Sequence, residues 1–219
     1  MDDAYLNIDN LYQWEFKNKK YPHFDTYFCS SRVKKLITQI EETKSLSHPF
    51  FPFIKFTQEK YKRDEKNRVY IDKDNSRAIM HTARIDSNIY AYYRLILMKK
   101  YEPILRELGI DECVTAYRKI VDKESNKGKC NVHFANEAID EIKRQTQTNG
   151  NCSAITMDIK GFFDNLDHSL IKKQWCYVMG FKSGLSKNHY TVYKNITRYR
   201  YIEAEKIEQI LGFNFNDRG

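Results

Sequence analysis

The stretch AITMDIKGFFDNLDH, residues 154–168, places the strongest constraint on what this 219-residue chain can fold into. The apolar run CSAITMD is short enough to be a buried strand, and it ends at Asp158. Gly161 and two phenylalanines follow, and Asp167 or Ser169 can cap a helix. The pattern therefore predicts a strand–turn–helix unit with the Asp158 carboxylate at the end of the strand, in a cleft at the edge of a sheet.

Apolar spacing predicts the other elements. A period near 3.6 residues predicts helices over residues 31–46, 87–108 and 132–145, with Gly109 as the C-cap of the second. The third helix should turn one apolar set inward: Val132, Ala135, Ala138, Ile139 and Ile142. Within residues 62–81, the runs RVYI and RAIM predict two short strands joined by the turn DKDNS.

Charge and cysteine content limit the classes of function. Lys and Arg outnumber Asp and Glu by 37 to 29, which fits a nucleic-acid-binding protein or a well-mixed solvated surface. Basic and aromatic residues alternate in HYTVYKNITRYRYI, residues 189–202, as they do in a stacking surface or a half-buried strand. The five scattered cysteines indicate neither a disulfide framework nor a zinc site, so a reducing cytoplasm fits. No run is long enough for a membrane span, and the acidic, polar N-terminus does not read as a signal peptide.

Asp158 alone can be an N-cap, a salt-bridge partner or a turn residue, but the string around it is more specific. DIKGFFDNLDH resembles the first catalytic motif in the palm domain of reverse transcriptases, especially group II intron and bacterial retron-like enzymes. Residues 70–105 resemble the fingers hairpin and the long helix after it. Residues 115–142 resemble the block between fingers and palm, although AYRK and a lysine-rich insertion depart from the intron pattern. Residues 170–197 resemble the defence-associated branch, also described as unknown-group or abortive-infection reverse transcriptases.

The resemblance spans about residues 68–202 and implies a fold. We expect an α/β protein of the α+β type, with the fingers and the start of the palm of a right-hand polymerase. The implied domains are a helical N-terminal region over 1–60, fingers over 61–150 and the beginning of a palm over 151–219.

The resemblance also implies an activity, RNA-directed DNA polymerisation in bacterial anti-phage defence. Phosphoryl transfer of this kind uses two Mg²⁺ ions, for which Mn²⁺ can substitute. Asp158 would be the catalytic metal ligand, and the Ile159 backbone carbonyl would add a second oxygen. Lys73 and Arg77 would bind the dNTP triphosphate, and Phe163 would pack against the sugar and exclude a 2′-hydroxyl.

Other residues near these positions have more than one interpretation. Phe162 is expected in the core. Asp164 is a turn or helix-start carboxylate, with metal binding as its alternative. Arg118, Lys127 and Lys129 are candidate nucleic-acid contacts. The alternative for the two lysines is that they do no more than keep a loop soluble.

A complete enzyme of this family carries a second aspartate pair, usually in a Tyr-x-Asp-Asp string, and this chain has none at that place. We therefore expect the N-terminal part of a longer polymerase or a truncated gene product, inactive by itself. The partners would be an RNA template, a DNA or protein primer and dNTPs, with no membrane and an unspecified oligomeric state. The alternative function is a non-catalytic nucleic-acid-binding or scaffold module derived from such an enzyme.

Overall fold

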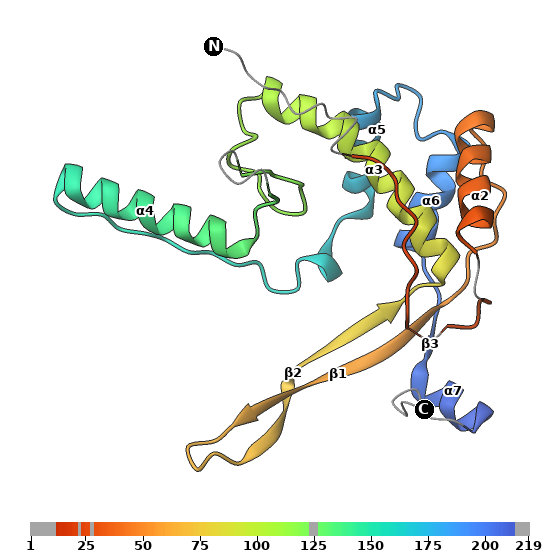
Figure 1. Ribbon diagram of the computed structural model, residues 1–219, viewed down its shortest axis with the longest axis horizontal. Coiled ribbons are helices and arrows are strands. Elements are labelled where there is room, and N and C mark those ends of the chain that lie inside the picture. The colour runs from red at the N-terminus through yellow and green to blue at the C-terminus, as the bar shows by residue number, and fades with distance from the viewer. Residues whose placement is uncertain (1–11, 22, 27–28, 123–126, 213–219) are drawn as a thin grey trace. The chain divides into compact units, whose positions relative to one another are not determined.

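The computed structural model describes residues 12–21, 23–26, 29–122 and 127–212, with the backbone alone at 72–76. The described chain is a mixed α+β protein, which confirms the expected fold class at this coarse level. The helices are α2 (Ser30–Thr43), α3 (Arg84–Glu107), α4 (Asn131–Asn149), α5 (His168–Met179), α6 (Lys187–Thr197) and α7 (Ala204–Leu211). The strands are β1 (Phe53–Arg63), β2 (Val69–His81) and β3 (Tyr201–Glu203), as labelled in Figure 1.

The chain forms two compact units. Of the described residues, unit 1 contains residue 12 and residues 98–122 and 127–171, and unit 2 contains those between 13 and 97 and residues 172–212. The limits differ from the expected domains, because residues before position 60 pack with the first half of α3 and with the C-terminal helices.

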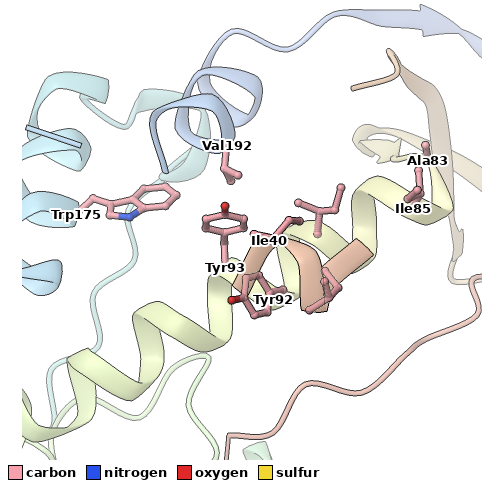
Figure 2. Close-up of a cluster of buried hydrophobic side chains, with 9 residues drawn as sticks. Ile40, Ala83, Ile85, Tyr92, Tyr93, Trp175 and Val192 are labelled. Carbon is pink, nitrogen blue, oxygen red and sulfur yellow. The ribbon is translucent and has the colours of Figure 1, made fainter. Parts of the chain in front are cut away.

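The core of unit 2 is made by four helices that are distant in sequence. Ile37 and Ile40 of α2 pack with Ile89, Tyr92 and Tyr93 of α3, Trp175 of α5 and Val192 of α6. Figure 2 shows Tyr93 pointing from α3 toward Trp175 and Val192. The predicted helical periods of α2 and α3 are confirmed. Gly109, two residues past the end of α3, has the positive φ of a C-terminal turn.

A buried carboxylate fixes the start of α3. The Asp25 side chain accepts hydrogen bonds from the backbone amides of Arg84 (2.7 Å) and Ile85 (3.3 Å), and from the Arg84 guanidinium (2.9 Å). It satisfies donors that the first turn of a helix cannot bond internally. The segment before α2 is thereby tied to α3.

The predicted hairpin exists, but its turn is elsewhere. β2 is a single strand paired antiparallel with β1, and the chain turns at residues 64–68. The expected turn DKDNS lies within β2, at a shift in register: Gln58 of β1 opposes Arg77, whereas Lys60 opposes Asp72. The prediction of a turn was wrong because Asp, Asn and Ser are typical of turns and also of irregular positions within a strand, and the pairing with β1 decides between them.

The third strand joins this ribbon by a parallel pairing, so the sheet order is β2-β1-β3. Phe53 opposes Tyr201, and the Phe53 amide donates to the Arg200 carbonyl (2.8 Å). Ile54 packs with Ala204 and Ile207 of α7 in a small second core. Figure 1 shows the β1–β2 ribbon extending well beyond this short parallel pairing.

Helix α4 of unit 1 is exposed to solvent. The helix predicted over 132–145 is present as α4, but no α4 residue is buried. The expected inward set is exposed instead, including Val132, Ile139 and Ile142. The periodicity was correct and the burial was wrong, because a helix buries its apolar face only where another element covers it.

Candidate functional site

The segment that carries Asp158 is exposed and unpaired in the described structure. Residues 151–159 form neither helix nor strand, and the Ile155 and Met157 side chains are 83% and 88% exposed. The predicted strand is therefore wrong for the described chain. Apolar residues do alternate in this segment. A strand, however, needs a neighbouring strand to bond its backbone N–H and C=O groups, and none of the described strands pairs with residues 151–159.

The turn after Asp158 has the expected local chemistry. Gly161 has φ +64°, and its carbonyl accepts the Asp164 and Asn165 backbone amides at 3.1 and 3.2 Å. A short 3-10 helix, Phe163–Asn165, follows. The Asp167 carboxylate then accepts the backbone amides of Ser169 (2.7 Å) and Leu170 (3.2 Å) at the start of α5. The prediction that Asp167 can cap this helix is confirmed.

Asp158 has a carboxylate that is available to a ligand. Its side chain is exposed and makes no hydrogen bond or ion pair with the described residues. Ile159, the expected carbonyl ligand, is exposed beside it. Among the described residues, no group of three or more His, Cys, Asp or Glu is arranged to hold a metal ion. Carboxylate and carbonyl oxygens suit Mg²⁺, but these two residues make only part of a coordination sphere.

An exposed aromatic cluster stands next to this carboxylate in the sequence. Phe163 is 64% exposed, and its ring contacts those of Tyr117 and Phe162, with centroids 6.0 and 5.2 Å apart. Phe162 is 47% exposed, so its expected place in the core is wrong. Without a sheet beneath the turn, neither ring has a core to enter. Asp164 lies in the 3-10 turn and is exposed, as expected for a turn carboxylate.

The two candidate triphosphate contacts lie on β2, which belongs to unit 2. Arg77 is exposed on the ribbon opposite Gln58, and Lys73 lies on the same strand, where only the backbone is described. Asp158 belongs to unit 1. The structure therefore does not unite these candidates in one compact unit.

Arg118 is part of a buried network. Its guanidinium makes two hydrogen bonds with Glu102 (2.9 and 2.7 Å), and Tyr12 donates to the same carboxylate (2.7 Å). Burial alone would raise the pKa of Glu102, but the hydrogen bonds and positive charge of Arg118 outweigh burial and lower it. We assign Arg118 to the core of unit 1 rather than to nucleic-acid contact.

The two lysines of the loop before α4 differ. Lys129 forms an ion pair with Glu137, and this hydrogen bond raises the lysine pKa. Its ammonium also lies 5.9 Å from the Phe134 ring centroid. Lys127 is exposed beside the short antiparallel bridge between Val121 and Gly128. Lys127 remains a candidate nucleic-acid contact, and Lys129 is held by Glu137 of the helix that follows it.

Lys194, Arg198 and Arg200 lie in the alternating stretch 189–202 that the sequence analysis considered, whereas Lys187 of α6 precedes it. Lys187 and Lys194 are seven residues apart, so they share a helix face, and Arg198 and Arg200 follow. The alternation in residues 189–202 is typical of a strand, yet most of it is helical. The spacing of the two lysines was the signal that could have indicated this basic face.

No protein-family model matches this sequence, and a comparison with curated proteins finds no significant relative. In the described parts of the chain, every helix is too short or too polar to cross a membrane.

Proposed function

We propose that this chain is the fingers and the start of the palm of an RNA-directed DNA polymerase. The observation that carries the proposal is the string DIKGFFDNLDH, in which Asp158 is exposed directly before a glycine turn and a helix capped by Asp167. The order of elements upstream supports it. An antiparallel hairpin, β1–β2, precedes the long helix α3, in the order that the resemblance to the fingers implies, although its turn lies at 64–68 and not at 72–76.

Phosphoryl transfer requires little covalent chemistry from the protein itself. Asp158 and the Ile159 carbonyl would hold a Mg²⁺ or Mn²⁺ ion, which when bound would activate the primer hydroxyl and neutralise charge on the leaving pyrophosphate. The absence of a competing partner for Asp158 in the described residues fits this role. The other carboxylate ligands of the metal ions would come from residues that the structure does not describe.

The remaining candidates would position the nucleotide. Arg77, exposed on the ribbon, would donate hydrogen bonds to triphosphate oxygens. Phe163, the more exposed ring of the pair, would contact the sugar face and disfavour a 2′-hydroxyl. Phe162 would support it from the side through their edge-to-face contact.

Primer extension on an RNA template tests the proposal. The protein is expressed from its gene together with any coding sequence that continues in frame, and a separate preparation contains the 219 residues alone. We expect synthesis by the longer product if a Tyr-x-Asp-Asp string follows, and none by the 219-residue chain.

Asp158→Asn should abolish that synthesis, and Asp164→Asn is the matched control. Both carboxylates are exposed in the same turn region, so neither change should shift the free energy of unfolding by more than about 0.5 kcal/mol. Full activity of Asp158→Asn, or equal loss in both variants, would refute the catalytic assignment.

The alternative is a nucleic-acid-binding module with no catalysis, and the incomplete metal set in the described residues favours it. It predicts template binding by every form of the protein and synthesis by none.

A further inference from the structure

Unit 2 contains a groove that none of the proposed polymerase residues lines. Its volume is about 640 Å³, and its walls are the segment Phe50–Phe53, Tyr90 of α3, one face of α6 and residues 198–200. All of these residues belong to unit 2. The groove is therefore a property of one compact unit.

The groove is strongly basic. Lys187, Lys194, Arg198 and Arg200 line it, and none of its lining residues is acidic. These four side chains are exposed, and they form no ion pair with the described residues. Four positive charges without local compensation make this concave surface attractive to a polyanion.

The same groove presents aromatic rings. Phe50 and Phe53 are stacked against Tyr90, with centroids 5.3 and 6.5 Å apart. Tyr199 packs edge-to-face on Phe53 (5.4 Å) and remains 47% exposed. Tyr190 and Phe51 are also exposed. The cations thus share the groove with aromatic side chains that are partly exposed to solvent.

Helical phase explains why α6 has this face. Val192 points into the core, as Figure 2 shows, and His189 is buried with it. Lys187 and Lys194 lie about 20° apart around the helix axis, on the side away from Val192. From Lys187 to Arg198 the row extends about 16 Å, the length of about five stacked nucleotides at ~3.4 Å each.

We propose that this groove binds single-stranded nucleic acid, with phosphates along the cations of α6 and bases against Tyr199 and its neighbours. Basic grooves with accessible rings are the usual arrangement for single strands, because every base has a face that can stack. A duplex keeps its bases stacked inside and cannot use the rings. The inference does not rest on the polymerase proposal, since it requires no metal ion and no nucleotide incorporation.

Fluorescence anisotropy with the full 219-residue chain tests the groove. The probes are labelled oligouridylate and oligothymidylate of about 12 nucleotides and a blunt duplex of the same length, between about 50 and 200 mM salt. We expect both single strands to bind at least five-fold more tightly than the duplex. The comparison of the RNA and DNA probes separates the two possible single strands.

Two charge variants localise the binding. Lys194→Gln combined with Arg198→Gln should weaken single-strand binding about ten-fold or more, and should reduce the slope of log K against log salt by about 1.4. The matched control is Lys34→Gln combined with Lys35→Gln, which removes two exposed charges from α2, outside the groove. The control should change Kd less than two-fold.

A ring variant tests stacking. Tyr199→Ala should weaken single-strand binding five-fold or more without changing the salt slope. Circular dichroism checks that each variant is folded. If Tyr199→Ala does not fold, the charge variants still decide the test.

The proposal would be overturned if the double variant in the groove and the control double variant lost equal affinity for single strands. Duplex binding as tight as single-strand binding would also overturn it. It would also be overturned if the groove pair lost affinity for anionic lipid vesicles or a phosphopeptide but not for the oligonucleotides.

Discussion

His189 should make this protein sensitive to acid. Its imidazole is buried between the rings of Tyr93, Trp175 and Phe181, and its Nδ1 accepts a hydrogen bond from the Trp175 indole (3.0 Å). Burial disfavours the charged form and lowers the pKa of His189 to about 4. The folded protein therefore holds this histidine neutral at pH values where an exposed histidine is charged.

The direction of the effect follows from proton uptake. Below the ordinary histidine pKa of 6.5 the unfolded chain binds a proton that the folded chain takes up only near pH 4. Stability should therefore fall as pH decreases across this window. Each pH unit costs about 1.4 kcal/mol, so lowering the pH from about 7.5 to about 5.0 should cost about 2 kcal/mol through His189 alone. His23 and His81, whose pKa values burial also lowers, should add in the same direction.

Urea unfolding followed by tryptophan fluorescence measures this cost at several pH values. His189→Asn keeps an acceptor for the Trp175 indole but cannot titrate, so its loss between the same two pH values should be smaller than the wild-type loss by about 2 kcal/mol. Val192→Ala, a buried change on the same helix without a titratable group, should lower stability equally at every pH. A His189→Asn protein with the wild-type pH dependence would refute the reasoning.

Three further changes test the buried contacts and the turn by urea unfolding. Glu102→Gln leaves the Arg118 guanidinium buried without its counter-charge and should cost about 3–5 kcal/mol, with single-strand affinity unchanged. A cost under about 1 kcal/mol would contradict this placement of the pair. Asp25→Ala removes both the α3 cap and the partner of Arg84 and should cost about 3 kcal/mol or more, whereas Asp25→Asn should recover part of the loss. Gly161→Ala places a Cβ at φ +64° and should cost about 1–2 kcal/mol, and a neutral result would argue against the turn geometry.

The candidate site could be predicted only where its structure is local. The capping role of Asp167 depends on the next three residues, and the sequence was sufficient to identify it. The strand before Asp158 was not predictable in the same way, because pairing needs a second strand that a local pattern does not contain. The predicted burial of Phe162 was wrong for the same reason, since a ring leaves water only where other side chains cover it.

Charged residues show the same limit. Arg118 and Lys194 look alike in a sequence of mixed charge. Arg118 is buried because Glu102, on another element, supplies its counter-charge. Lys194 lines a groove because the helix phase of α6 and the segment Phe50–Phe53 place it there. Glu102 is distant in sequence from Arg118, and the segment Phe50–Phe53 is distant from Lys194. Composition could therefore indicate only an overall positive charge.

The sequence by itself determined the local conformation of this protein: the helical periods of α2, α3 and α4, the glycine after α3 and the cap of α5. These features depend on residues within about one helical turn of one another. Only the tertiary structure decided that the hairpin turns at 64–68, that α4 remains exposed and that His189 is buried. Strand register and burial are set by contacts between segments far apart in the chain, and no single segment encodes both partners.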